Sequence, residues 1–410
     1  MRIAHTESSV HMGGQQLRIL DQIQWMLNKG HSTWLLARED SAIHEEATRR
    51  GIPTHVVPFR GSVHPLAVLE IVQFAREEEI QLIDCHSSSD ACSVIVARLF
   101  GIPTVRTLHV DTSKTDLVHK WLWRYGNDHV VVVSQWIADK LSKLGLVDAH
   151  KISVIPTGID LQRFKTNGNG YYIRKEFDIP ENTKVISEIA MIRPDKGQKY
   201  FIRAIDKIAA VFPDIRFLIV GSATRPEFLE EIKKEIAALR HRDKVILTGF
   251  RHDIEDFIAA SDVIVNSSLS EPRSQLIHQA FAMEKIIVAS NVGGNVETIR
   301  HGETGFLFDS GEVESLSRTV LSVLGNNTQQ IRERAHLTAL LEFGIDTMMG
   351  KTLNIYEMIL KAKLRLPQIS RVIRIPRVVI SHVSIRYHQP LSLPVIDNII
   401  GMSRGSLWVN

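Results

Sequence analysis

Cysteine is scarce in this chain of 410 residues, which contains only Cys85 and Cys92. Two cysteines make no disulfide framework, and their separation differs from that of zinc-binding pairs. No apolar run reaches the roughly 18 residues that a membrane-spanning helix needs. The first residues enter a strand pattern without an apolar signal core. We therefore expect a protein of the reducing cytoplasm.

An excess of charge of one sign is also lacking. Lys and Arg number 49 against 46 Asp and Glu, which gives a formal net charge of +3. So small an excess gives no support for a nucleic-acid partner. Hydrophobic residues make up 44% and charged residues 23% of the chain, as in ordinary globular proteins. Its length exceeds what one core of usual size holds, so we expect two domains.

Short apolar runs and amphipathic stretches alternate through the first part of the chain. This alternation predicts a parallel sheet with helices on both faces. The predicted strands are Arg2 to Thr6, Ser32 to Leu36, His55 to Pro58, Leu82 to Cys85, Val105 to Leu108 and His129 to Val133. The predicted helices between them include Leu17 to Asn28, Leu66 to Glu78 and Gln135 to Leu144.

The alternation restarts after a turn-rich stretch, Lys165 to Gly170, which indicates a surface linker. The predicted strands of a second sheet are Val185 to Met191, Arg216 to Val220, Lys244 to Leu247, Val263 to Val265 and Ile286 to Ala289. Its predicted helices are Gln198 to Val211, Glu227 to Leu239, Gln275 to Met283 and Val313 to Leu324. We therefore expect domains over residues 1–165 and 180–345, a closing helix over 346–365, and a basic, apolar tail over 366–410.

The most informative segment is Ser270 to Ala280, in which Glu271 lies in the loop between a predicted strand and a predicted helix. In open α/β sheets, loops at the carboxyl ends of strands border the ligand crevice. A carboxylate there is badly placed to bind phosphate but well placed to accept hydrogen bonds from hydroxyls beside one. Gln279 lies about two turns inside the helix, where an amide can bridge a ribose diol. A sugar nucleotide offers both groups.

Two cations, Arg193 and Lys196, precede Gly197 in the loop after the first strand of the second half. Arg193 can hold a diphosphate in bidentate fashion, and Lys196 can hold it as a point charge. Cations at the start of a helix oppose the helix dipole, so their presence needs a reason. One reason would be that the two cations stabilise the charge that grows on a leaving diphosphate. The alternative is that they form a basic turn exposed to solvent, with no ligand.

Five glycines follow predicted strands and are candidates for contact with a nucleotide diphosphate or a reacting sugar, because glycine lets backbone N–H groups approach a ligand closely. These are Gly13, Gly14, Gly221, Gly293 and Gly294.

His109 ends the predicted strand Val105 to Leu108, and we assign it to orienting a sugar. His86, which follows Asp84-Cys85, is a weaker candidate of the same kind. Either histidine also fits a purely structural role, in which its ring nitrogens are satisfied inside the protein.

Along the chain, Lys196-Gly197 is followed by Glu271, then by Gly293-Gly294 with Glu297, and then by Thr304-Gly305-Phe306. In this order, the segments resemble those of the family 4 retaining glycosyltransferases, and the resemblance covers about residues 1 to 360. Members of that family have an E-x7-E region, an Arg and a Lys before a Gly, and later Gly-Gly and Thr-Gly-Phe stretches. The resemblance implies the GT-B fold, an α/β architecture in which two Rossmann-like doubly wound domains face a cleft that closes on the donor. It assigns Glu271 to the donor sugar, Gln279 to the ribose, Arg193 and Lys196 to the diphosphate, and His109 to the sugar.

The implied reaction moves a sugar, with retention, from a UDP or GDP donor to a glycan or lipid-linked glycan, in lipopolysaccharide or exopolysaccharide synthesis. An Asp-x-Asp motif, the usual metal–diphosphate bridge of the other glycosyltransferase fold, does not occur in the sequence. We therefore expect no metal site and no cofactor besides the sugar nucleotide, which is a co-substrate.

Three departures from the family pattern leave other interpretations open. Gln279 stands in place of the second Glu, Pro272-Arg273-Ser274 replaces Gly-Phe-Gly, and Thr157 stands where Asn is usual. A catalytically inactive sugar-nucleotide-binding protein and an epimerase of the same fold are the alternatives. The tail over 366–410 has five Arg and one Asp. It can contact anionic lipid on the cytoplasmic face of the inner membrane, or form an extra strand or a loose extension.

Overall fold

Seven parallel strands form the first sheet of the computed structural model, which describes residues 1–60, 64–110, 117–166 and 168–365. Their order across the sheet is β3-β2-β1-β4-β5-β6-β7. The strands are β1 (Arg2–Glu7), β2 (Ser32–Ala37), β3 (Thr54–Val56), β4 (Leu82–Cys85), β5 (Thr104–Leu108), β6 (His129–Val132) and β7 (Ile152–Val154). The chain order reverses between β1 and β4, and in such sheets ligands bind outside the carboxyl ends of the strands at the reversal.

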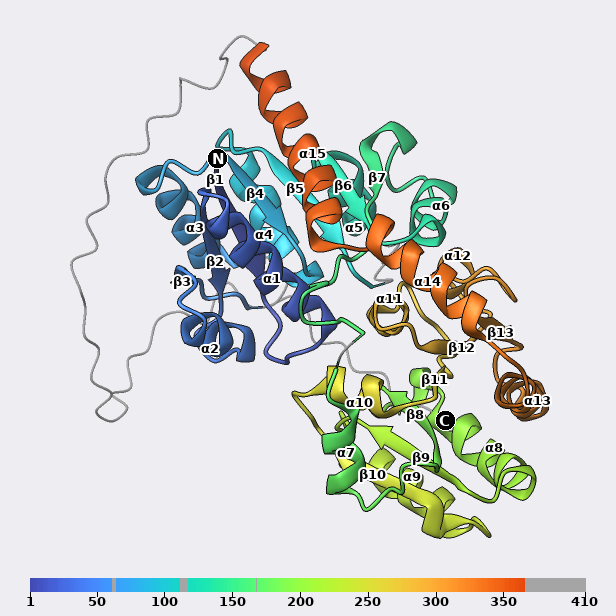
Figure 1. The fold of residues 1–410 in the computed structure, drawn as a ribbon. Coiled ribbons are helices and arrows are strands. Elements are labelled where there is room, and N and C mark those ends of the chain that lie inside the picture. The colour runs from blue at the N-terminus through green and yellow to red at the C-terminus, as the bar shows by residue number, and fades with distance from the viewer. Residues whose placement is uncertain (61–63, 111–116, 167, 366–410) are drawn as a thin grey trace, which may run out of the picture. The chain divides into compact units, whose positions relative to one another are not determined.

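Helices flank this sheet in Figure 1. They are α1 (Gly14–Asn28), α2 (Ala42–Arg49), α3 (Pro65–Glu77), α4 (Ser88–Arg98), α5 (Leu117–Tyr125) and α6 (Gln135–Lys143). Every residue of β4, β5 and β6 is buried. They are buried because helices cover both faces of a parallel sheet.

Six parallel strands form the second sheet, in the order β10-β9-β8-β11-β12-β13. The strands are β8 (Lys184–Ile189), β9 (Ile215–Val220), β10 (Val245–Gly249), β11 (Val263–Asn266), β12 (Ile286–Ser290) and β13 (Phe306–Phe308). The chain order reverses here between β8 and β11. The loops after these two strands therefore occupy the position at which ligands bind to open α/β sheets.

The helices of this half are α7 (Gly170–Glu176), α8 (Gln198–Val211), α9 (Pro226–Ala237), α10 (Ile254–Ala260), α11 (Gln275–Ala282), α12 (Asn295–Thr298), α13 (Val313–Gly325) and α14 (Gln329–Glu342). A short 3-10 helix, η2 (Pro194–Lys196), lies between β8 and α8. Two apolar clusters fill this half. One contains Val185 and Leu218 and the other Ile186 and Phe217, which are successive residues of β8 and β9 whose side chains point to opposite faces.

The predicted fold class is confirmed, because two doubly wound parallel sheets are present. The predicted strands lie within a residue or two of the observed ones. Two edge strands, β7 and β13, were not predicted as strands. Each has only three residues, too few to show a strand period, and β3, equally short, was recognised only because it begins the apolar run His55 to Pro58.

The last described helix, α15 (Ile345–Arg365), packs onto the first sheet. Its Tyr356 and Ile359 belong to the same buried cluster as Ile3 of β1. The Tyr356 hydroxyl donates a hydrogen bond to Asp84 at 2.6 Å and accepts one from Gln22 at 2.9 Å. The predicted tail over 366–410 lies outside the described residues.

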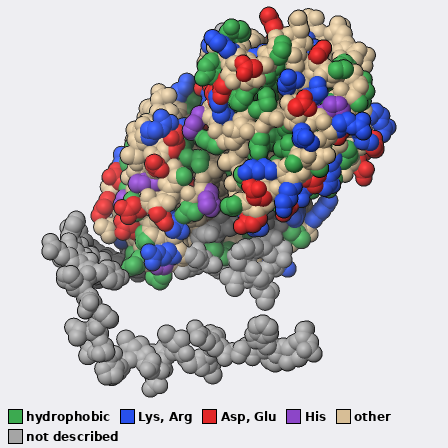
Figure 2. Space-filling model, turned by 90° about the horizontal axis from the view of Figure 1, so that it is seen from below, with side chains coloured by type: hydrophobic (Ala, Val, Ile, Leu, Met, Phe, Trp, Pro, Cys, Tyr) green, Lys and Arg blue, Asp and Glu red, His purple; other side chains and the backbone are tan. Residues whose placement is uncertain are grey.

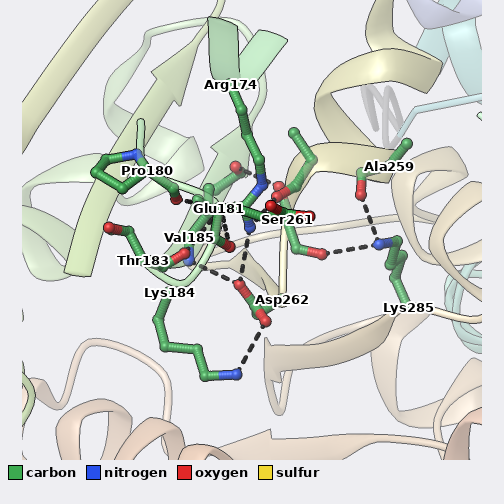
Figure 3. Close-up of polar contacts among 12 residues, drawn as sticks. Arg174, Pro180, Glu181, Thr183, Lys184, Val185, Ala259, Ser261, Asp262 and Lys285 are labelled. Atoms are coloured by element: carbon green, nitrogen blue, oxygen red, sulfur yellow. Dashed lines mark hydrogen bonds and ion pairs between the residues drawn. The ribbon is translucent and has the colours of Figure 1, made fainter. Parts of the chain in front are cut away.

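A network of polar contacts at the amino edge of the second sheet, opposite the loops that border a ligand, is drawn in Figure 3. Asp262, just before β11, accepts hydrogen bonds from the Val185 backbone N–H at 2.9 Å and from Lys184 at 3.2 Å. Arg174 donates to Asp262 at 3.3 Å and to the carbonyl of Thr183 at 2.8 Å. Lys285 donates to the carbonyl of Ser261 at 3.0 Å. These contacts tie α7, β8 and β11 together and leave the carboxyl edge for a ligand.

Basic and acidic side chains are interspersed over the face drawn in Figure 2, with hydrophobic side chains between them. The coloured, described residues on this face form no continuous basic field of the kind that nucleic acids select. Among the described helices, none combines the length and the apolar character that a membrane span requires.

Candidate active site

Two loops lie side by side at the reversal point of the second sheet. Loop 190–197 follows β8, loop 267–274 follows β11, and the two strands pair in parallel. The carboxyl ends of parallel neighbours lie at one edge of the sheet. Lys196 and Glu271, both predicted from the sequence, lie one on each loop and meet there.

Lys196 and Glu271 form an ion pair in which Nζ lies 2.7 Å from Oε2. The hydroxyl of Ser268 donates to the same oxygen at 3.1 Å. The two side chains are only 15% and 7% exposed, so each charge depends on the other for compensation. Among the described residues, none donates to Oε1 of Glu271. One carboxylate oxygen and two ammonium protons can therefore bind a ligand.

Glycines let these loops pack backbone against backbone. A Cβ atom at Gly197, where φ is +74°, would collide with the carbonyl oxygen of Ser267. A Cβ atom at Gly293, where φ is +45°, would collide with that of Glu271, and the N–H of Gly294 donates to the same carbonyl at 2.8 Å. These glycines fix the position of the Glu271 loop. The predicted contact of Gly293 and Gly294 with a ligand stays a prediction.

Gly221, another predicted contact, directly follows β9 with φ at +145°. A Cβ atom there would collide with the carbonyl oxygen of Ala190, in the loop after β8. Gly221 therefore packs the loop after β9 against the one that contains Lys196, and its contact with a ligand stays a prediction.

A second carboxyl group, that of Glu188 on β8, lies beneath the ion pair and is buried. Its Oε1 is hydrogen bonded to the hydroxyl of Ser267, and its Oε2 has no partner among the described residues. The same hydroxyl lies 3.0 Å from the carbonyl oxygen of Lys196. Burial raises the pKa of Glu188 to about 8, against the opposing effects of Ser267 and Lys196. A protonated Glu188 can donate a hydrogen bond to the hydroxyl of Ser267, and that hydroxyl can then donate its single proton to the carbonyl oxygen of Lys196.

Arg193 forms a different ion pair. Its Nε atom is 2.9 Å from Oδ1 of Asp195, and its side chain is 34% exposed. Its backbone is extended where η2 begins, with φ at −160°. Of the two predicted cations, Lys196 reaches Glu271 and Arg193 pairs with its neighbour. The predicted contact of Arg193 with a diphosphate stays a prediction.

Gln279 lies on α11 and is partly buried. Its side chain forms no hydrogen bond with the described residues, so its predicted role at a ribose stays a prediction. Arg273, in the segment that departs from the family pattern, has a side chain only 6% exposed. It lies 3.4 Å from Glu297, donates to His278 at 3.3 Å and stacks over the ring of Phe343. This departure therefore has a structural explanation.

Gly13 and Gly14 begin α1. Gly13 is the N-cap residue with extended backbone, and as a glycine it has no side chain that could cap the first N–H groups of the helix. The carbonyl of Gly14 accepts a hydrogen bond from the side chain of Gln275, the first residue of α11, at 3.1 Å. The first N–H groups of a helix lack intrahelical partners and can donate to a ligand. The predicted contact of Gly13 and Gly14 with a ligand stays a prediction.

His109 is the end of a row of three histidines on neighbouring strands. Nε2 of His109 lies 3.0 Å from Nδ1 of His86, and Nε2 of His86 lies 3.1 Å from Nδ1 of His5. Burial lowers the pKa of His5 and of His86 to about 3, and lowers the pKa of His109 well below its usual range. All three rings are therefore neutral at physiological pH.

Sequence reasoning missed Glu188, His5 and Asp84, which the fold buries beside the two reversal points. Each is a buried polar residue on a strand at the centre of its sheet. Burying such a group is costly unless it is hydrogen bonded, and this cost is the signal that could have identified them. The register that places His5 opposite Asp84 is visible only in the structure.

Two family models match the chain. The model of glycosyl transferases group 1 matches residues 172–338, and that of glycosyltransferase family 4 matches residues 12–163. Together they account for well over half of the sequence.

The chain belongs to the family 4 glycosyltransferases.

Among curated glycosyltransferases, the chain is similar to the UDP-Gal:alpha-D-GlcNAc-diphosphoundecaprenol alpha-1,3-galactosyltransferase of Escherichia coli. The two are 25% identical over 353 residues, which cover 82% of this chain and 90% of the relative. The chain is also 25% identical to the lipopolysaccharide core biosynthesis glycosyltransferase LpsE of Rhizobium meliloti, over 53% of this chain and 60% of LpsE.

Solved glycosyltransferases share the fold. A glycosyltransferase from Rickettsia africae superposes with a TM-score of 0.81 at 24% identity, covering 88% of this chain and 98% of that one. Anabaena HepE, solved in complex with UDP-glucose, superposes with a TM-score of 0.76 at 24% identity, covering 87% of this chain and all of that one. The resemblance predicted from the sequence motifs is thus confirmed for family and fold.

Proposed function

We propose that this glycosyltransferase uses a nucleoside-diphosphate sugar and transfers the sugar, with retention, to a glycan or lipid-linked glycan. The observation that carries the proposal is the Lys196–Glu271 pair at the reversal point of the second sheet. It places a cation for phosphate and a carboxylate for sugar hydroxyls on neighbouring loops.

Lys196 can stabilise the departing diphosphate. As the bond between the anomeric carbon and the phosphate oxygen breaks, negative charge grows on the nucleotide, and a fixed cation lowers that barrier. The largely buried side chain of Lys196 suits this role, because charges interact more strongly away from water. Arg193 joins it in our proposal by turning from Asp195 to the phosphate.

Retention follows from substitution on one face of the sugar. The acceptor oxygen bonds to the anomeric carbon on the side from which the phosphate leaves, and the acceptor proton passes to a phosphate oxygen. The protein then supplies position and charge and needs no separate base. Glu271, already paired with Lys196, serves in this scheme as a binding residue, and His109 orients the sugar.

We propose that the reaction needs no divalent metal, because Lys196 supplies positive charge at the position where a diphosphate would lie and the sequence has no Asp-x-Asp motif. Activity in excess EDTA, compared with activity after addition of Mn²⁺ or Mg²⁺, tests this. Loss of turnover in EDTA that either metal restores would contradict the proposal.

The donor is named by experiment in two steps. A thermal-shift screen with UDP, GDP and ADP identifies the base, because ligand binding stabilises the folded chain by mass action. Incubation with the labelled sugar nucleotides of that base then separates the candidate activities. Slow release of nucleoside diphosphate and free sugar indicates a transferase. Isomerised donor indicates an epimerase, and unchanged donor indicates a protein that only binds.

Substitutions of two lysines test the site. Lys196→Ala should lower donor cleavage by roughly a hundredfold or more, the size of effect expected for a group that stabilises developing charge. Lys199→Ala is the matched control, because Lys199 forms a more exposed pair with Glu231 at 2.6 Å. Near-normal cleavage by Lys196→Ala, with the control unaffected, would remove the assignment.

The acceptor and the pathway are proposed from the relatives. The Escherichia coli relative acts on a diphosphoundecaprenol-linked sugar, and LpsE is named for lipopolysaccharide core biosynthesis. We therefore propose a lipid-linked or envelope glycan acceptor, and work at the cytoplasmic face of the inner membrane. Sedimentation with anionic liposomes, for the full chain and for a chain ending at Pro367, tests whether the tail contacts lipid.

A further inference from the structure

Three histidines cross the first sheet at its carboxyl edge. His5 lies in β1, His86 directly follows β4, and His109 directly follows β5, and these strands are neighbours in the order β1-β4-β5. His5 and His86 are buried, whereas His109 is partly exposed. The row therefore runs from the interior of the sheet to the edge at which ligands bind.

A buried carboxyl group lies beside the row. Asp84, in register with His5, accepts hydrogen bonds from the hydroxyls of Tyr356 at 2.6 Å and Thr107 at 2.8 Å. Its carboxylate lies 3.8 Å from Nε2 of His86. Alternate residues of a strand point to the same face, so Asp84 and His86 lie on the same face of the sheet.

The hydrogen bonds couple the tautomers of the three rings. A neutral imidazole has one donor and one acceptor nitrogen. Both nitrogens of His86 are engaged, so both bonds run in the same direction along the row. Either every Nδ1 carries the proton or every Nε2 does. Nδ1 of His109 has no hydrogen-bond partner among the described residues. The proton position on His5 thus decides whether this Nδ1 is a donor or an acceptor.

One direction fits the surroundings better. Nε2 of His5 is buried and has no partner among the described residues. Orphaned buried N–H groups are rarer in proteins than under-satisfied acceptors, which favours the proton on Nδ1 of His5. His5 then donates to His86, and His86 donates to His109. The remaining Nδ1–H of His109 is a donor at the edge of the sheet.

We propose that His5 and His86 are positioning residues that fix His109 as a hydrogen-bond donor to an oxygen of the donor sugar. This inference rests on the proposed function, in which His109 orients the sugar. It goes further by assigning the tautomer of His109 and the two residues that set it.

His5, Asp84 and His86 also offer nitrogen and oxygen atoms within 4.8 Å of one another, a separation that a metal ion can span. The relay explains the same geometry without one. The facing nitrogens of His5 and His86 are at hydrogen-bond distance from each other, and the Asp84 carboxylate already accepts from Tyr356 and Thr107. Zinc content of the purified chain is therefore part of the test.

The first experiment measures donor cleavage and nucleotide affinity with the full chain. His5→Leu removes the donor to His86 and should lower kcat about tenfold or more, because a misdirected group loses much of its effect. UDP affinity should stay unchanged, since the proposed diphosphate site is on the second sheet. His5→Asn keeps an N–H near the position of Nδ1 and should recover much of the loss.

His129 provides the matched control. It is buried in the same sheet, on β6, and is hydrogen bonded to Ser153 at 2.9 Å, apart from the row. Burial lowers its pKa too. His129→Leu should reduce stability without the selective loss of kcat. Equal losses of kcat in His129→Leu and His5→Leu would overturn the proposal, as would full activity of His5→Leu.

The second experiment reads the tautomers directly and needs no activity. Nitrogen-15 shifts of labelled histidine should show His5, His86 and His109 neutral, all with the proton on Nδ1, and His5→Leu should change the populations at His86 and His109. Protons on Nε2, mixed tautomers, or stoichiometric zinc that His5→Leu removes would overturn the relay. A chain without donor cleavage but with these shifts would refute the proposed function alone.

Discussion

Glu188→Gln should stabilise this glycosyltransferase, and increasingly so as the pH rises. The side chain is buried in β8, and burial raises its pKa from 4.5 to about 8. The unfolded chain therefore releases this proton at lower pH than the folded chain does. Between about pH 4.5 and 8 the free energy of unfolding of the wild-type chain therefore falls as the pH rises, by roughly 1.4 kcal/mol per pH unit. Glutamine keeps the shape and cannot ionise.

The size of the effect follows from the two pKa values. At pH 7, ionisation of Glu188 stabilises the unfolded state by roughly 3 kcal/mol, whereas the folded state keeps the carboxyl largely protonated. The free energy of unfolding is lowered by this amount. The variant should thus gain about this much relative to wild type between pH 4.5 and pH 7. The gain should level off above about pH 8, where the folded carboxyl also ionises.

Urea unfolding of both proteins at pH 5, 6, 7 and 8 measures the difference, provided that the slope against urea concentration is the same for both. Glu181→Gln, a change at an exposed side chain, controls for effects on the unfolded chain. A difference between Glu188→Gln and wild type that stays constant with pH would refute the reasoning. It would show that the carboxyl ionises in the fold as it does in the unfolded chain.

Two further predictions concern the histidines and the glycines. The lowered pKa values of His5 and His86 mean that the unfolded chain binds more protons below about pH 6.5, so stability present above that pH should fall toward pH 3 by about 1.4 kcal/mol per unit for each ring. Urea unfolding should show this slope reduced in His5→Asn, and equal slopes would contradict it. Gly302→Ala should cost about 1 kcal/mol, because its left-handed backbone has open space around it. Gly293→Ala should cost more and weaken UDP binding in calorimetry, because its Cβ collides with the Glu271 backbone; equal costs for the two would argue against loop packing.

The sequence was sufficient for the fold class and for placing two residues of the site in loops after strands. Buried strands such as β11 and β12 are largely apolar runs, which is why they could be predicted, whereas β7 and β13 are short edge strands without such a run and could not. Lys196 and Glu271 could each be predicted to lie in a loop after a strand, but their contact could not, because it depends on β8 and β11 being neighbours. The pairing of Arg193 with Asp195 could not, since it depends on the local turn of η2.

Interactions across strands were beyond pattern analysis for a different reason. The row from His5 to His109 depends on which strands are neighbours and on their register. Neither is encoded in the spacing of residues along the chain. Glu188 poses the same difficulty, because its protonation depends on how completely the surrounding loops exclude water.

The contact between Tyr356 and Asp84 joins positions 272 residues apart. A ribosome synthesises the first sheet early, and domains generally begin to fold during synthesis. Helix α15 nevertheless contributes Met349, Tyr356 and Ile359 to the interior of that sheet. Until those residues emerge, the nascent first domain has an open apolar seam and an Asp84 without its tyrosine partner. A chain interrupted before α15 would accordingly be a target for chaperones and proteases, even though all of its strands had been made.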